Sequence, residues 1–287
     1  MKKIYVYLPG EKRLIEEKVW GEGLLRYLYL ERTDSRLLLF FAKSRALSRL
    51  CGWYYRMPWT RRKVAHFVQK FDIVIADFEN KKYRHFNDFF TRRLHPRARP
   101  IASSSLVSPA DGRLLAFETF PEQGIWIKGC TFSQDAFFAK KSALYSRFKD
   151  GPMIIIRLAP PDYHRFHAPL SGIITQVAKV RGSLFSVNPL ALATKPAYLC
   201  ANYRIHIVIE GKICVCMTLV GATNVGSIAF TGKVGDTVLC GDDLGCFNLG
   251  GSMIVLSITE GKPDTELVTR SLSGIETLVR VGTPLII

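Results

Sequence analysis

Apolar residues follow a helical period in the first hundred residues and a strand period in the rest of the chain. Two helical stretches are expected, from about Leu24 to Tyr55 and from Arg61 to Leu94. Beyond Ile101 the apolar runs shorten and glycines separate them, which is typical of an antiparallel sheet. We therefore predict an α+β fold, in which a mainly antiparallel β catalytic domain over 101–287 is preceded by a helical region over 1–100.

Strand patterns are clearest in three places. The segment from Ile4 to Leu8 alternates before a Pro-Gly pair, which indicates a strand or an extended arm. Residues from Tyr203 to Val208 also alternate, and from Ile213 to Leu219 the odd-numbered apolar residues share one face. The tripeptide Glu210-Gly211-Lys212 is expected to form the turn that joins these last two strands into a hairpin.

The charge of the chain is concentrated near its N-terminus. With 287 residues, 48% hydrophobic and 22% charged, the composition is that of a globular protein. The formal net charge is +16, and residues 1–100 hold 23 Lys and Arg against 10 Asp and Glu. A basic partner-binding surface is therefore expected in the N-terminal region.

Within the first predicted helix, Leu47, Leu50 and Tyr54 share one face. Arg45, Arg49 and Arg56 share the other face, and aromatic residues follow up to Trp59. Such a helix suits the headgroup region of an anionic membrane, although its apolar face could equally pack on the protein's own core. Nucleic acid is not expected as a partner, because no recognisable nucleic-acid-binding motif accompanies the charge.

The cysteines and the hydropathy of the chain indicate the cellular compartment in which the protein is expected. The seven cysteines are an odd number without a CxxC pair, so they predict reduced, mostly buried thiols of an intracellular protein, with no disulfide framework and no metal site. No signal peptide or membrane-spanning run is recognisable, and the expected location is peripheral, on the cytoplasmic face of the cell membrane.

The tripeptide Gly250-Gly251-Ser252 is the main candidate for chemistry. Adjacent glycines let a nucleophile approach the Gly251 carbonyl closely, and the Ser252 hydroxyl is the nearest nucleophile. A serine hydroxyl needs a base, usually a histidine that a carboxylate orients. Such partners occur upstream at Asp111 and in the segment from Tyr163 to His167, although Gly-Gly-Ser by itself is most often a flexible turn.

Several ordered motifs together resemble the phosphatidylserine decarboxylase family, whose members process themselves and carry a pyruvoyl group. The resemblance extends from about Phe86 to the C-terminus. It rests on Phe86-Asn87-Asp88-Phe89-Phe90-Thr91-Arg92, Ser108-Pro109-Ala110-Asp111-Gly112, Tyr163-His164-Arg165-Phe166-His167, Leu184-Phe185-Ser186-Val187-Asn188, Val220-Gly221-Ala222-Thr223-Asn224-Val225-Gly226-Ser227-Ile228 and the Gly-Ser site.

The resemblance implies self-cleavage between Gly251 and Ser252. The hydroxyl of Ser252 would attack the Gly251 carbonyl, and β-elimination with hydrolysis would then leave a pyruvoyl group on a chain of residues 252–287, the α chain. The β chain would span 1–251, and the two would form a heterodimer, alone or within a larger homo-oligomer. By position, His167 matches the family base and Asp111 the carboxylate that orients it.

The resemblance also implies the reaction of the mature enzyme. The pyruvoyl group would form a Schiff base with phosphatidylserine and accept electrons as CO2 leaves, giving phosphatidylethanolamine without a metal or a diffusible cofactor. His164 takes the position associated with decarboxylation. Further candidate substrate contacts are Tyr163, Phe185, Ser186, Asn188, Gly221 and Ala222.

Two positions depart from the family pattern. Met253 stands where a threonine or serine commonly follows the nucleophile, and Tyr203 stands where a glutamate is frequent. An active enzyme with slower maturation is expected. Two alternatives remain: a serine hydrolase that uses Asp111, His167 and Ser252 on another molecule, although it lacks the Gly-x-Ser-x-Gly elbow, and a basic membrane-binding protein without activity.

Overall fold

A computed structural model describes most of the chain. The described residues are 5–17, 23, 45–79, 81–119, 134–139, 142–185, 187, 198–222, 228–250 and 252–287, without the side chains of 45–49, 142, 198 and 199.

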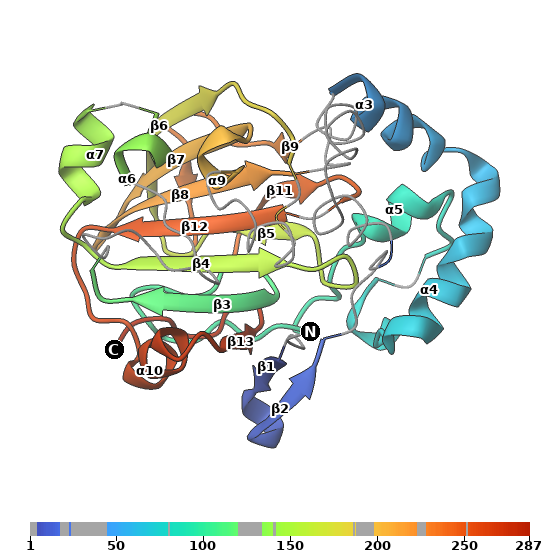
Figure 1. Ribbon diagram of the computed structural model, residues 1–287, viewed down its shortest axis with the longest axis horizontal. Helices are drawn as coiled ribbons and strands as arrows, with labels where there is room; N and C mark the ends of the chain where they lie inside the picture. The colour runs from blue at the N-terminus through green and yellow to red at the C-terminus, as the bar shows by residue number, and fades with distance from the viewer. Residues whose placement is uncertain are drawn as a thin grey trace.

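The described residues form a ten-stranded sheet that is antiparallel except at one pair of strands (Figure 1). The parallel pair joins β1 to β13. The strands, in their spatial order, are β10 (Thr237–Val238), β6 (Gly172–Val180), β7 (Arg204–Glu210), β8 (Cys214–Gly221), β12 (Ser252–Ile258), β4 (Met153–Leu158), β3 (Gly112–Phe117), β13 (Glu276–Val279), β1 (Tyr5–Leu8) and β2 (Arg13–Glu16).

A smaller antiparallel sheet lies against one face of the large one. Its order is β5 (Arg165–His167), β11 (Asp243–Phe247) and β9 (Ile228–Phe230). Phe166 and Phe247 of the small sheet share a buried core with Ile254 and Leu256 of β12. Because successive side chains of a strand alternate between faces, Met253 and Val255 belong to a different core on the opposite face.

Short helices also pack on the large sheet. Phe137 of α6 (Gln134–Phe137) packs on the face that carries Met253, and Phe148 of α7 (Ser142–Phe148) packs nearby on Cys216. Helix α10 (Thr265–Leu272) is tied to β3 because Ser271 Oγ accepts a hydrogen bond from the Ala116 amide, at 2.7 Å. A further short helix, α9, spans Tyr198–Ala201.

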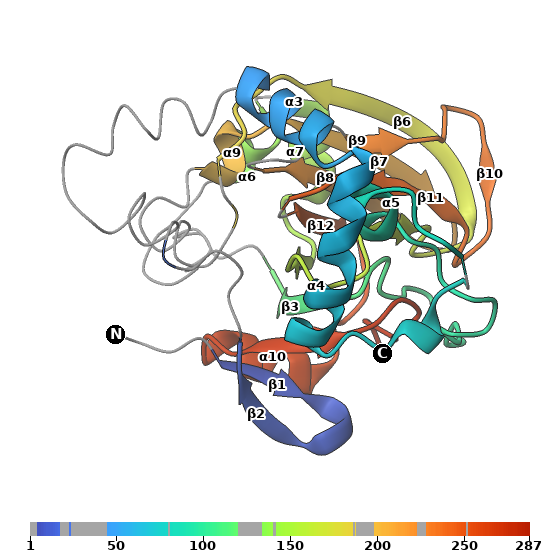
Figure 2. The same cartoon turned by 90° about the vertical axis from the view of Figure 1, so that its right-hand side faces the viewer.

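The helices of the first hundred residues run along one side of the molecule (Figures 1 and 2). They are α3 (Arg45–Tyr54), α4 (Lys63–Phe71) and α5 (Phe86–Phe90), with 3₁₀ turns at Pro58–Arg62 and Ile75–Asp77. A further 3₁₀ turn, Pro9–Glu11, joins β1 to β2. Helix α5 lies between α4 and the sheets, and its phenylalanines form an aromatic cluster with Phe67. Leu249, close to the start of β12, also belongs to this cluster.

The predicted α+β class is confirmed, and so is the hairpin of β7 and β8, in which Glu210 pairs with Cys214. The predicted N-terminal arm is β1, and with β2 it extends the large sheet beyond β13. The boundary near residue 100 stays a prediction. The six cysteines among the described residues are free, while Cys130 lies outside the described part.

Candidate active site

Ser252 is the first residue of β12 and is completely buried. It lies between Leu158 of β4 and Gly221 of β8 in the strand register. The alternation of β12 places it on the face of Ile254, which is the face that the small sheet covers. Met253 therefore points away from the side on which Ser252 lies.

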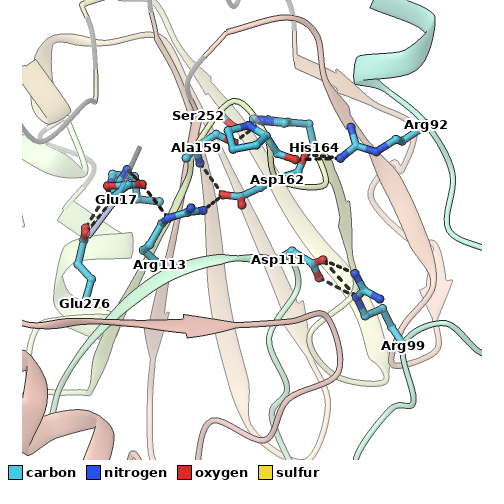
Figure 3. Close-up of polar contacts among 12 residues, drawn as sticks. Glu17, Arg92, Arg99, Asp111, Arg113, Ala159, Asp162, His164, Ser252 and Glu276 are labelled. Carbon is cyan, nitrogen blue, oxygen red and sulfur yellow. Dashed lines mark hydrogen bonds and ion pairs between the residues drawn. The ribbon is translucent and has the colours of Figure 1, made fainter. Parts of the chain in front are cut away.

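His164 contacts this serine directly (Figure 3). Its Nδ1 atom lies 3.3 Å from Ser252 Oγ, and its Nε2 atom lies 2.9 Å from the Ala159 carbonyl oxygen. A carbonyl only accepts, so Nε2 carries the proton in the neutral ring and donates it to Ala159. The lone pair of Nδ1 consequently faces the hydroxyl of Ser252, which is the arrangement of a general base and a nucleophile.

The environment keeps His164 neutral. The imidazole is fully buried, and the ring of Phe90 stacks on it with 4.0 Å between ring centres. Burial lowers the pKa of His164 to about 3, and the positive charges of Arg92 and Arg113 act in the same direction. At neutral pH the ring therefore holds no net charge, and its lone pair is available to the serine.

His167 has other partners. Its Nδ1 atom lies 2.8 Å from the Gly241 carbonyl oxygen and its Nε2 atom lies 3.0 Å from the hydroxyl of Tyr163. By the same reasoning Nδ1–H donates to Gly241, and Nε2 accepts from Tyr163. Burial lowers the pKa of His167, while the nearby carboxylates of Asp243 and Asp111 oppose this effect.

Asp111 is held by an arginine (Figure 3). Its carboxylate accepts two short hydrogen bonds, from Arg99 Nη2 at 2.7 Å and from the Val281 amide at 2.8 Å. Asp111 is close enough to His167 to influence its pKa. Among the described contacts, however, none joins Asp111, His167 and Ser252 into a direct hydrogen-bonded chain, and the histidine that reaches Ser252 is His164.

The loop that supplies the Ala159 carbonyl is fixed by buried charges. Asp162 accepts a hydrogen bond from the Ala159 amide at 2.7 Å and pairs with Arg113. The pairing continues across the sheet through Glu17, Arg157 and Glu276 (Figure 3). Although burial alone would lower the pKa of Arg157, the carboxylates of Glu276 and Glu17 raise it, so the arginine stays charged.

Arg92, from the N-terminal region, binds the same loop. Arg92 is 1% exposed, and the central carbon of its guanidinium group lies 4.3 Å from the ring centre of Phe78 and 4.7 Å from that of Phe89. Its Nη2 atom donates to the carbonyl oxygens of Pro161 and Asp162, at 3.0 Å each. Burial lowers the pKa of Arg92 to about 10, which still leaves it charged at neutral pH.

The other residues predicted from the sequence are distributed as follows. Tyr163 is buried against His167, and Gly221 pairs with Ser252. Ala222 is buried one residue further along, and the backbone of Phe185 is held by both side-chain atoms of Asn202. Gly251, Ser186 and Asn188 lie outside the described residues. Within the described ranges, no three His, Cys, Asp or Glu side chains are grouped to hold a metal ion.

Three groups that hold His164 in place were not predicted from the sequence. They are the Ala159 carbonyl, Asp162 and Arg92, which act on His164 through the backbone of its loop. The prolines at 160 and 161 signalled an irregular loop, but a pattern of residue types does not say which carbonyl an imidazole meets. Phe90, which belongs to one of the motifs that carry the resemblance, also contacts His164, because its ring stacks on the imidazole.

Comparisons with known proteins give a consistent result. Residues 86–286 match the family model described as phosphatidylserine decarboxylase. Curated relatives named phosphatidylserine decarboxylase proenzyme include one from Clostridium novyi, 37% identical with 97% of each chain covered. Another, from Desulfitobacterium hafniense, is 40% identical and covers 93% of this chain and 92% of its own. A third, from Fusobacterium nucleatum, is 34% identical, with 93% and 91% covered.

Proposed function

Because this chain belongs to the phosphatidylserine decarboxylase family, we propose that it is a proenzyme that cleaves itself before Ser252 and then converts phosphatidylserine into phosphatidylethanolamine and CO2. The observation that carries the proposal is the buried hydroxyl of Ser252, whose Oγ atom lies 3.3 Å from His164 Nδ1. A serine hydroxyl becomes a nucleophile when a neighbouring base takes its proton.

In the first step, His164 Nδ1 accepts the hydroxyl proton while Ser252 Oγ attacks the carbonyl carbon of residue 251. The amide bond between the two residues breaks, an ester bond to Oγ forms, and the proton passes to the released amine. Removal of the α-proton of residue 252 then expels the carboxylate of residue 251. Water completes the conversion, releasing ammonia and leaving a pyruvoyl group at the start of β12.

We assign the first proton transfer to His164 because it contacts Ser252 in the described conformation. The triad of Asp111, His167 and Ser252 stays a prediction from the resemblance. The bond between Tyr163 and His167 suits this pair to a later step, since a phenol and an imidazole can together deliver a proton. Asp111, held by Arg99, adds negative charge on the side of His167.

The site fits a pyruvoyl group. Such a group supplies an electron-withdrawing carbonyl that binds the substrate amine and accepts electrons as CO2 leaves. Ser252, from which it would derive, has no exposed surface, and the stacked ring of Phe90 helps to exclude water from the same place. The neutral His164 beside it can accept a proton at Nδ1 without prior deprotonation.

We propose that the two products of cleavage stay together as a heterodimer. Residues 252–287 contain β12 and β13, which pair within the large sheet with β4, β8 and β3. Breaking the chain before β12 leaves the pairing of residues 253–257 with β4 and β8 in place. The candidate substrate contacts Phe185, Gly221 and Ala222 belong to the larger product.

The N-terminal helices are the proposed contact with anionic membranes. Leu50, Trp53 and Trp59 are each more than half exposed, and the basic side chains of Arg61 and Arg62 are exposed next to them. Exposed tryptophans beside cations suit the interface of a bilayer that carries negative lipids. The proposed attachment is peripheral, through these exposed side chains. No described helix is long and apolar enough to cross a membrane.

The proposal is tested by the release of labelled CO2 from phosphatidylserine in vesicles. The wild-type chain is expected to release CO2 and to be cleaved, and Ser252→Ala is expected to do neither while it still binds the vesicles. A serine hydrolase would lose activity in the same variant, but its wild-type chain would remain intact. A membrane-binding protein without activity would release no CO2 in either form.

A further inference from the structure

A single short helix contacts both halves of the site at which the chain is to be cleaved. Helix α5 carries Asn87 and Phe90, three residues apart and therefore on neighbouring positions of one helix face. Phe90 stacks on His164, while Asn87 binds the chain that precedes Ser252. Helix α5 thus contacts both His164, the proposed base, and the residues that precede the proposed scissile bond.

Asn87 uses both atoms of its side-chain amide for this contact. Its Nδ2 atom donates to Asn248 Oδ1 at 3.1 Å, and its Oδ1 atom accepts from the Leu249 amide at 3.0 Å. Asn87 is 6% exposed, so water does not easily replace these bonds. The side chain of Leu249 is buried in the aromatic cluster with Phe67.

Helix α5 has an independent anchor. The Asn87 amide donates to the Tyr55 carbonyl oxygen at 3.0 Å, and the Phe86 amide donates to Thr60 Oγ1 at 3.1 Å. Just beyond the helix, Arg92 holds the loop of His164 through its two carbonyl contacts. The helix is therefore fixed from the N-terminal side and can hold other segments in place.

The segment after Leu249 needs such an anchor. Gly250 has a φ of +143°, a conformation that side chains disfavour, and a glycine there leaves the chain free to adopt many others. An attack within one chain is fast only when the reacting atoms are kept close together and well oriented. The last described anchor before Ser252 is the pair of bonds from Asn87 to Asn248 and Leu249.

We infer that Asn87 is a positioning residue for self-cleavage, which holds the chain before the scissile bond against the pair of Ser252 and His164. The inference rests on the proposed function, since it concerns the cleavage that the function requires. Asn87 transfers no proton and touches no reacting atom. Its effect is exerted through Asn248 and Leu249.

The inference is tested on the full chain in a cell-free translation, where the appearance of fragments is followed with time. Asn87→Ala is expected to slow cleavage about 10- to 100-fold, because a displaced carbonyl is reached less often. Asn87→Asp keeps an oxygen that can accept from the Leu249 amide, and an intermediate rate is expected. Asn248→Ala should slow cleavage less, and the double variant Asn87→Ala, Asn248→Ala should be no slower than Asn87→Ala alone.

Ser271→Ala is the matched control. Ser271 is also 6% exposed and also makes two hydrogen bonds, to the Ala116 amide and the Leu267 carbonyl, but it belongs to α10, which lies away from α5 in Figure 1. It should lower the melting temperature of the uncleavable Ser252→Ala protein about as much as Asn87→Ala does, while leaving the cleavage rate unchanged.

Cleavage of Asn87→Ala at the wild-type rate, or a delay no greater than that of Ser271→Ala, would overturn the inference. If Asn87→Ala does not fold, Asn87→Asp and Asn248→Ala test the inference instead. Cleavage of both variants at the wild-type rate would then overturn it. A wild-type chain that yields no fragments would instead refute the proposed function, so the two failures are distinguishable.

Discussion

His164 and His167 lie three residues apart and are held in different ways. Each donates from one ring nitrogen to a backbone carbonyl, which leaves the other nitrogen as an acceptor. The acceptor of His164 faces Ser252, and that of His167 faces Tyr163. Since only the first of these partners borders the proposed scissile bond, we expect the two histidines to serve different steps.

Replacing each histidine separately tests this division. His164→Ala is expected to reduce the rate of self-cleavage by 100-fold or more, because the Ser252 hydroxyl then has no base in contact. His167→Ala is expected to cleave at nearly the wild-type rate but to release CO2 more slowly. Gel analysis of freshly translated protein measures the first effect, and labelled CO2 the second. The opposite pattern would favour the triad of Asp111, His167 and Ser252.

The low pKa of His164 also predicts a dependence of stability on pH. Burial lowers the pKa of His164 in the folded protein to about 3, whereas in the unfolded chain it is about 6.5. Below pH 6.5 the unfolded chain therefore binds a proton that the folded protein does not, so stability is lost as the pH falls toward 3.

Urea unfolding of the uncleavable Ser252→Ala protein measures this loss. Between pH 7 and pH 5, the protein with His164 is expected to lose about 2 kcal/mol more of its unfolding free energy than the same protein with His164→Asn. All other titrating groups are common to both proteins and cancel in the comparison. Parallel pH dependences would show that His164 titrates normally in the folded state.

At the scale of elements, the N-terminal helices have two faces with different roles. Inward, Phe67 of α4 and the phenylalanines of α5 pack on Leu249 and so reach the active site. Outward, Trp53 and Trp59 are exposed. Of the apolar face predicted for the first helix, the described side chains Leu50 and Tyr54 are exposed rather than packed on the protein's own core. The inward packing comes from α4 and α5 instead, and contact of the outer face with a membrane stays a proposal.

The outward face can be tested by replacing its two tryptophans. The double variant Trp53→Ala, Trp59→Ala is expected to bind vesicles containing phosphatidylserine about 100-fold more weakly, since burying a large apolar side chain contributes about 1.5 kcal/mol or more. Sedimentation with the vesicles gives the affinity. Leu272→Ala is the control, because Leu272 is 74% exposed on α10, away from α3 in Figure 1. Equal binding by all three proteins would contradict the assignment.

At the scale of the whole molecule, local patterns predicted strands better than the arrangement of the elements. The helical stretch expected from Arg61 to Leu94 was wrong in part, because the structure has two separate helices there, α4 and α5, with a 3₁₀ turn between them. The β7 and β8 hairpin follows from alternation, because its two faces belong to different cores. The parallel pairing of β1 with β13 joins residues that are far apart in sequence, and nothing in either segment specifies the other. The same holds for α5, whose contact with Leu249 depends on how the helical region lies on the sheets.

The active site shows the same limit. The motifs identified Ser252 and His164, because those residue types at those positions resemble a known family. Which histidine meets the serine depends on the loop after β4, and Asp162 and Arg92 hold that loop from two directions. Contacts of this kind arise only when distant segments come together, so the sequence pattern alone does not contain them.

The most direct test of the central claim is the intact mass of the purified, denatured wild-type protein. We expect two fragments, residues 1–251 and 252–287, and the mass of the smaller one should correspond to a pyruvoyl group in place of its N-terminal serine. Ser252→Ala should give one species with the mass of the full chain. A single uncleaved wild-type chain of 32.4 kDa would contradict the account.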